Sequence, residues 1–66
     1  MINYVKECRV SLGMTQQELG DQLQVSRQTI FSIETGKYVP STILSLKISK
    51  VFNKTVEEVF LLDEND

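Results

Sequence analysis

The apolar residues of this 66-residue chain recur at intervals of three and four in five short segments, which are separated by polar or turn-forming residues. Such spacing places apolar side chains on one face of a helix, and no segment shows the alternation of a half-buried strand over four or more residues. The pattern therefore predicts an all-α fold. The five helices are expected at about residues 3–12, 15–23, 26–35, 42–52 and 55–60.

Turn-forming and capping residues support these boundaries. Gly13 follows the first helix at the position of a left-handed C-cap. Residues 15–18 and 55–58 both read Thr-x-x-Glu, the spacing of a capping box, in which hydroxyl and carboxylate each accept a free backbone N–H. Ser26 and Ser41 are the expected N-caps of the third and fourth helices.

Length and composition bound the organisation of the chain. A chain of 66 residues, 41% of them hydrophobic, has material for one core, so residues 1–66 are expected to form a single domain. No apolar run approaches the roughly 20 residues that cross a bilayer. Cys8 is the single cysteine and cannot form an internal disulfide, and the first residues lack a signal-peptide pattern. We therefore expect a soluble protein of the reducing cytoplasm.

The formal net charge of -2 at first argues against a polyanionic partner. The charge is unevenly distributed, however, because residues 57–66 hold five acidic residues and no basic one. Residues 1–56 hold seven basic and four acidic residues, a net charge of +3. Since salt screens charges beyond about 8 Å, a polyanion responds to the local charge rather than to the total. Nucleic acid therefore remains a candidate partner, with the acidic tail of residues 63–66 expected to point away from it.

Residues 16–35 fit two short helices joined by a tight turn, the unit that places its second helix in the major groove of DNA. Such a unit needs a small residue midway along its first helix so that the second can cross closely, and Gly20 occupies that position. Core packing alone explains the apolar residues of the unit, which are Leu19, Leu23, Val25, Ile30 and Ile33.

The outward face of the second helix in this unit carries residues of base-reading type. Helical spacing places Gln28 and Ser32 opposite its apolar face, with Arg27, Thr29 and Phe31 on the flanks. Glutamine pairs with adenine through two hydrogen bonds, arginine with guanine or phosphate, and threonine or phenylalanine contacts the thymine methyl group. A polar face that only meets solvent is the alternative, and the surrounding turn pattern favours base reading.

Four spaced segments indicate a family. They are residues 14–20 (Met-Thr-Gln-Gln-Glu-Leu-Gly), 25–30 (Val-Ser-Arg-Gln-Thr-Ile), 33–37 (Ile-Glu-Thr-Gly-Lys) and 40–41 (Pro-Ser). Together they resemble the phage Cro and repressor-type helix-turn-helix family of small bacterial or phage transcriptional regulators. The resemblance implies a compact five-helix, lambda-repressor-like DNA-binding domain whose second and third helices form the helix-turn-helix. It also implies a sequence-specific regulator, expected to be a repressor, that binds a palindromic operator in double-stranded DNA as a homodimer.

By the same resemblance Arg27, Gln28 and Ser32 would face bases. Phe31 stands where small or polar residues are commoner in the family, so it either touches a thymine methyl group or lies over the neighbouring helix. The residues expected to contact the DNA backbone are Gln16, Ser26, Lys37 and Tyr38.

Three further positions have structural roles. Gln24 stands where the family usually has a glycine in a left-handed turn, which costs a non-glycine residue about 1–2 kcal/mol. Arg9 interrupts the apolar stripe of the first helix, and Glu34 sits on the buried side of the third. The resemblance implies that Arg9 and Glu34 form a mostly buried ion pair, and two separate surface charges are the alternative.

The C-terminal third is expected to form the dimer interface, near residues 56–62. A core built by so short a chain is small, and residues 59–62 are a continuous apolar run that one helical face cannot bury. One recognition helix also reads too few base pairs for useful specificity. Ile43 is a further candidate, and Ile2 and the tail are candidates for short paired strands there. The interface residues are Val59, Phe60, Leu61 and Leu62.

Catalysis finds no support in the sequence. The chain has no histidine, no glycine-rich phosphate loop, no metal-ligand cluster and no base beside Cys8. We therefore expect no enzyme activity, metal, cofactor or small-molecule ligand. The alternative function is a protein-binding module, such as an antitoxin or antirepressor, that uses the same fold. A polar array of residues 27–29 beside Lys37 favours DNA, because a pure protein binder has no need of it.

Overall fold

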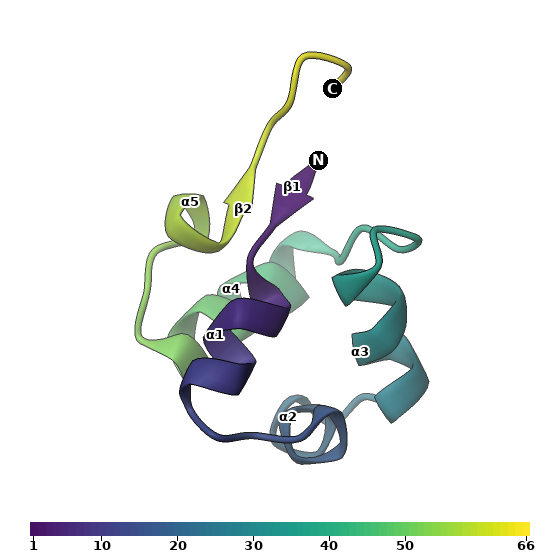
Figure 1. The fold of residues 1–66 in the computed structure, drawn as a ribbon, viewed down its shortest axis with the longest axis vertical. Coiled ribbons are helices and arrows are strands. Elements are labelled where there is room, and N and C mark those ends of the chain that lie inside the picture. Colours follow the sequence, from purple (N-terminus) through teal and green to yellow (C-terminus); the bar gives the residue numbers. More distant parts are fainter.

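Nine buried apolar side chains, contributed by all five helices and one strand, meet at the centre of the computed structural model, which describes residues 1–66 (Figure 1). This arrangement confirms the predicted five-helix fold. No helix is both long and apolar enough to cross a lipid bilayer. The helices are α1 (Val5–Ser11), α2 (Gln16–Leu23), α3 (Arg27–Glu34), α4 (Thr42–Phe52) and α5 (Val56–Val59). The nine core residues are Val5, Leu19, Leu23, Ile30, Ile33, Ile48, Phe52, Val59 and Phe60.

Four of the five helices begin at a serine or threonine whose side chain accepts a backbone N–H of the first turn. Both predicted capping boxes form, at Thr15 with Glu18 and at Thr55 with Glu58. In the second box the backbone N–H of Thr55 donates to the Glu58 carboxylate at 2.8 Å, and this bond holds the pKa of Glu58 below its usual value. Local chemistry therefore sets where these helices start.

The two ends of the chain pair with each other. Strand β1 (Ile2–Asn3) runs antiparallel to strand β2 (Phe60–Leu61). Residues 2 and 3 are extended, so α1 begins at Val5, two residues later than predicted. Phe60 is extended as well, so α5 ends at Val59, one residue earlier than predicted. The expected pairing of Ile2 with the tail is thus made within one chain.

The side chain of Asn3 fastens this strand pair to the rest of the fold. Its Oδ1 accepts the N–H of Val5 at 3.2 Å, and its Nδ2 donates to the carbonyl oxygen of Ile33 at 3.0 Å. The first bond satisfies a free N–H at the start of α1, which has no side-chain cap at Tyr4. The second bond joins β1 to the C-terminal end of α3.

Two helices end at a non-glycine residue in the left-handed conformation. Gln24 ends α2 with a φ of 60°, as the predicted left-handed turn requires, and Asn53 ends α4 with a φ of 55°. Asparagine tolerates this conformation better than most residues. Asn53 is therefore a sequence signal for the end of α4, although the predicted boundary did not depend on it. Glutamine has no such advantage, so Gln24 is the strained residue of the pair.

Gly20 sits where α2 and α3 cross, as predicted. A Cβ atom added at Gly20 would lie 2.7 Å from the backbone oxygen of Val25, in the turn between the two helices. A backbone atom cannot move aside as a flexible side chain can. Close approach of the helix-turn-helix pair therefore depends on this glycine.

We predict that Gly20→Ala destabilises the fold by about 1–3 kcal/mol, because the added methyl group pushes the turn away from α2. Urea unfolding followed by circular dichroism measures this. Gln22→Ala, at an exposed position of the same helix, is the matched control and should change stability by less than about 0.5 kcal/mol. Equal stability of the two variants would contradict the close crossing.

Candidate nucleic-acid interface

Helix α3 lies at one side of the molecule, beside the end of α2 (Figure 1). Its buried face holds Ile30 and Ile33, which are completely inaccessible to solvent. Its N-terminal end starts at Ser26, whose Oγ accepts the Thr29 N–H at 3.1 Å. A short helix held on one side and open on the other has the shape needed to enter the major groove.

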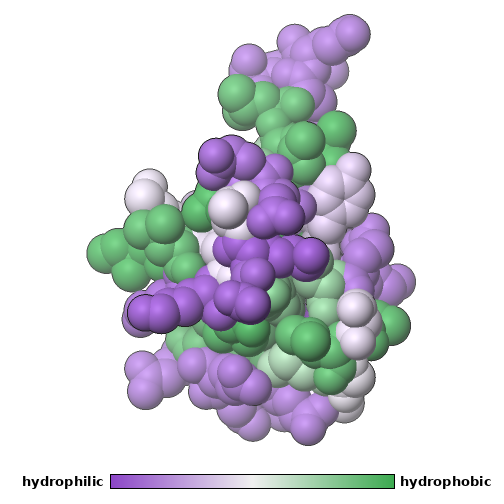
Figure 2. Space-filling model, turned by 90° about the vertical axis from the view of Figure 1, so that its left-hand side faces the viewer, coloured by the Kyte–Doolittle hydropathy of each residue, from purple (hydrophilic) through white to green (hydrophobic).

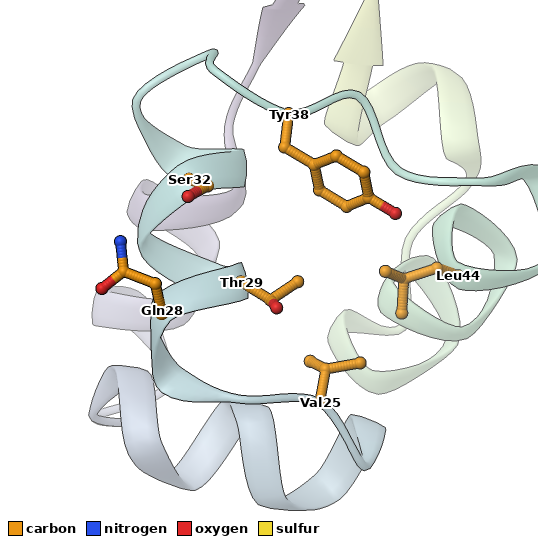
Figure 3. Close-up of a pocket in the computed structure, with 6 residues that line it drawn as sticks. All are labelled: Val25, Gln28, Thr29, Ser32, Tyr38 and Leu44. Atoms are coloured by element: carbon orange, nitrogen blue, oxygen red, sulfur yellow. The ribbon is translucent and has the colours of Figure 1, made fainter.

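The structure separates the five expected base-reading residues into a face and two flanks. Gln28 is exposed and Ser32 is half-buried on the same side of α3, with Arg27 and Phe31 exposed on one flank. Thr29 lies on the other flank, facing α4, and its hydroxyl is 2.9 Å from the Ser26 hydroxyl (Figure 3). Thr29 is therefore partly engaged within the protein, whereas the Gln28 side chain is left without a hydrogen-bond partner in the chain.

A surface groove of about 420 Å³ separates α3 from α4. Figure 3 shows the Tyr38 ring reaching across its upper end toward Leu44, with Gln28 and Ser32 on the α3 wall and Val25 at the bottom. Leu44 was not predicted to line a site, and Val25 was assigned only to the core, because a groove between two helices has no local sequence signal. The lining residues of this α3–α4 groove are Val25, Gln28, Thr29, Ser32, Tyr38 and Leu44.

The expected backbone contacts occupy three different settings. Lys37 is exposed beyond the end of α3, with its Nζ 6.0 Å from the centre of the Phe31 ring, within the range of a cation–π contact. Tyr38 lines the α3–α4 groove, and Ser26 uses its hydroxyl as a cap. Gln16 donates from Nε2 to Glu34 Oε1 at 3.0 Å, so one of its two amide hydrogens remains free.

The ion pair between Arg9 and Glu34 is present. Arg9 Nε lies 2.7 Å from Glu34 Oε2, and the two side chains are only 11% and 4% exposed. Arg9 Nη2 lies 3.3 Å from the second carboxylate oxygen, and Arg9 Nη1 donates to the carbonyl oxygen of Met14 at 2.7 Å. With Gln16 also bound to Glu34, one carboxylate joins α1, α2 and α3.

The apolar C-terminal run divides into a buried and an exposed half. Val59 is fully buried and Phe60 is 9% exposed, so both side chains belong to the core of their own chain. Leu61 is 39% and Leu62 81% exposed. Figure 2 shows hydrophobic surface beneath the hydrophilic C-terminal end. Of the expected interface, Leu61 and Leu62 thus remain open to a partner, and so does Ile43, at 68% exposure.

The acidic tail leaves the molecule at the end opposite α2 (Figure 1). The Met1 amine lies 3.1 Å from both the Asp63 and the Asp66 carboxylates. Hydrogen bonds to Asp66 and Asp63 raise the pKa of this amine, and the Asn65 N–H, followed by the amine, lowers the pKa of Asp63. Two carboxylates of the acidic tail are therefore paired with a cation of the same chain, away from α3.

Comparison with known proteins agrees with this geometry. Residues 5–59, which include every helix, match a family described as helix-turn-helix. The chain belongs to the helix-turn-helix family. It is 48% identical over its whole length to the whole of YgzD, an uncharacterized HTH-type transcriptional regulator of Bacillus subtilis. The crystal structure of the clp gene regulator ClgR from Corynebacterium glutamicum shares the fold, with a TM-score of 0.76, 22% identity, and coverage of 82% of this chain and 57% of ClgR.

Two more distant members of the helix-turn-helix family have named roles. The competence pilus inhibition repressor of Acinetobacter baylyi is 36% identical over 92% of this chain and 56% of its own length. The transcriptional activator BcrR of Enterococcus faecalis is 39% identical over 91% of this chain and 29% of its own length. Both repression and activation therefore occur among the relatives.

We predict that Arg9→Ala lowers the free energy of unfolding by about 3–5 kcal/mol, because it leaves the Glu34 carboxylate buried without its cation. Thermal and urea unfolding measure the loss, with Lys6→Ala on the exposed side of α1 as control. Arg9→Lys keeps the charge but not the bidentate contact with both carboxylate oxygens, so the loss of stability should be intermediate. An unchanged thermal midpoint for Arg9→Ala would contradict the role of the pair.

Proposed function

We propose that this chain is a sequence-specific DNA-binding transcriptional regulator that inserts α3 into the major groove of double-stranded DNA. The observation that carries the proposal is Gln28, which lies exposed and unpartnered near the start of α3, on a helix whose opposite face is fully packed. The family match supports the proposal, and so do the names of the relatives, which describe regulators of transcription.

In this proposal Gln28 reads adenine, accepting from N6 and donating to N7. Ser32, one turn further along the same face, donates to or accepts from a neighbouring base edge. Arg27 pairs with guanine or phosphate, and Phe31 contacts a thymine methyl group while Lys37 lies over its ring. Thr29 contributes from the α3–α4 groove, where its methyl group can meet a thymine methyl.

The backbone contacts hold α3 in register. Gln16 keeps one amide hydrogen for a phosphate on one side of the helix. Lys37 and Tyr38 reach the backbone from the loop after α3, and Ser26 does so from the turn before it. Such contacts position the protein without carrying sequence information. Since Glu34 binds both Gln16 and Arg9, the phosphate contact and the helix orientation are set together.

We further propose that two chains associate at the terminal strands and bind a palindromic operator. Leu61, Leu62 and Ile2 supply exposed apolar surface at these strands, and Ile43 on α4 is a further exposed apolar residue proposed for the interface. Val59 and Phe60 act beneath that surface as core residues. Two-fold symmetry would place the two Gln28 side chains about 34 Å apart, one turn of B-DNA.

Repression is the regulatory role that we propose, because a DNA-binding domain of this size acts most simply by occupying an operator. The match covers a larger share of the named repressor than of the named activator. The site of action is the cytoplasm, where DNA is present and the free Cys8 stays reduced. In-vitro transcription from a promoter carrying the selected site tests repression against activation.

We predict that Gln28→Ala weakens binding to the selected operator by about 1–3 kcal/mol and relaxes preference at one base pair. Selection of bound sites from random DNA identifies the operator first, and fluorescence anisotropy then measures both affinities. Lys37→Ala is the contrasting variant and should weaken binding to all DNA sequences alike. The slope of log K against log salt should then be lower by about 0.9, one phosphate contact.

Equal loss of specific and random-DNA affinity for Gln28→Ala would contradict its role in reading bases. Absence of any salt-dependent DNA binding by the wild-type chain would instead contradict the proposed function as a whole and favour a protein-binding module.

We predict that Leu62→Asp yields monomers with weakened operator binding, because it places a charge in the proposed apolar interface. Leu62 is 81% exposed within one chain, so the fold itself should be unaffected. Sedimentation equilibrium at micromolar concentration measures the assembly. Val10→Asp, at a 57% exposed position on α1, is the matched control. A wild-type monomer that binds a half-site as tightly as a palindrome would rule out the dimer.

A further inference from the structure

A second surface hollow lies between the C-terminal end of α2 and helix α4, at the turn that leads into α3. Its volume is about 280 Å³. Val25 lines the groove and the preceding residue Gln24 lines the hollow, while on α4 Leu44 lines the groove and Lys47, one turn later, lines the hollow. The two hollows are therefore lined by neighbouring residues of the turn and of α4. The residues of this lysine hollow are Gln22, Leu23, Gln24, Lys47, Lys50 and Val51.

The lysine hollow is positively charged, and its cations are free. Lys47 and Lys50 are exposed and take part in none of the ion pairs of the chain. Two carboxylates are near in the chain or in a neighbouring hollow. Asp21, which precedes Gln22, accepts a hydrogen bond from the Gln17 side chain, and Glu58, which shares a different hollow with Lys50, closes the capping box of α5. Neither carboxylate lines the lysine hollow. An anion placed there meets two ammonium groups.

The backbone of Gln24 is strained where it borders the hollow. Its φ of 60° is one that glycine adopts without steric cost, so the glutamine side chain is retained at the expense of backbone strain. That side chain lines the lysine hollow and makes no hydrogen bond within the chain. Strained backbone conformations cluster at active sites and ligand-binding sites. Packing within the chain gives no reason for a glutamine at this turn.

We propose that the lysine hollow binds backbone phosphates of the same DNA duplex whose bases face α3, with Lys47, Lys50 and the Gln24 amide as donors. The inference rests on the proposed function and extends the contact surface beyond α3, its two flanking loops and Gln16 at the start of α2. A phosphodiester offers only acceptor oxygens, which match ammonium and amide N–H donors. The lysine hollow also lies close to the α3–α4 groove, because its residue Gln24 directly precedes Val25 of the groove in the turn between α2 and α3.

The first test is the salt dependence of binding. The double variant Lys47→Gln with Lys50→Gln should lower the slope of log K against log salt by about 0.9 for each lost phosphate contact, on operator and random duplex alike. Fluorescence anisotropy at several salt concentrations gives the slope. The control carries Lys6→Gln and Lys54→Gln, which make the same change in net charge outside the lysine hollow and should leave the slope nearly unchanged.

The second test is Gln24→Gly, which should move two quantities in opposite directions. The thermal midpoint should rise, because glycine relieves the left-handed strain. Affinity for the operator and for random DNA should fall, because the amide donor of Gln24 is lost. A residue with only a structural role would leave affinity equal or raise it with stability. A fall in affinity beside a rise in the midpoint supports the proposal.

The failures of the two proposals are distinguishable. If wild-type protein binds DNA and the Lys47 and Lys50 variants keep its salt slope, the lysine hollow does not bind phosphate and only this inference is overturned. The inference is also overturned if those variants lose an acidic protein partner while DNA binding is intact. If the wild-type chain binds no DNA, the proposed function fails first.

Discussion

The carboxylate of Glu34 is the group on which the placement of the recognition helix depends. It is almost fully buried at the last residue of α3, where an uncompensated charge would be costly, so it requires a cation and further donors. Arg9 from α1 and Gln16 from α2 meet that need. Apolar packing is nondirectional and tolerates small rotations, whereas these short hydrogen bonds do not. The orientation of α3 relative to two other helices is therefore set at one carboxylate.

A second tether reaches the same end of α3 from the other direction. Asn3 donates to the carbonyl oxygen of Ile33, directly before Glu34, and Asn3 belongs to the strand pair formed by the chain ends. The surface proposed for dimerisation and the proposed reading helix thus share a direct connection through one side chain. A two-fold operator demands a fixed distance between two recognition helices. The Asn3 hydrogen bond is a short link between the proposed dimer interface and α3, which suits that requirement.

Features governed by neighbours in sequence were predictable, and those governed by distant contacts were less so. The caps at Ser26 and Ser41 set where α3 and α4 begin, and Gly20 permits the close crossing of the helix-turn-helix; all three follow from local chemistry. The pairing of Arg9 with Glu34 came only from family resemblance, because 25 residues separate them. Val59 and Phe60, which were predicted to lie near the dimer interface, are instead buried in the core of their own chain, at the point where β2 pairs with β1. Strands of two residues have no recognisable local sequence pattern, so this pairing could not be predicted with its register.

Charge is partitioned by the fold in a way that reconciles an acidic chain with a polyanionic partner. The tail carboxylates of Asp63 and Asp66 bind the Met1 amine at one end of the molecule, while Lys37 lies beyond the end of α3. Salt screens the tail from α3 at distances beyond about 8 Å, so its repulsion of phosphate weakens with separation. The acidic end also disfavours the approach of DNA to the proposed dimer interface, so that apolar surface stays available to a second protein chain. The local arrangement of charges, rather than the net charge of the whole chain, therefore determines which partners the chain can bind.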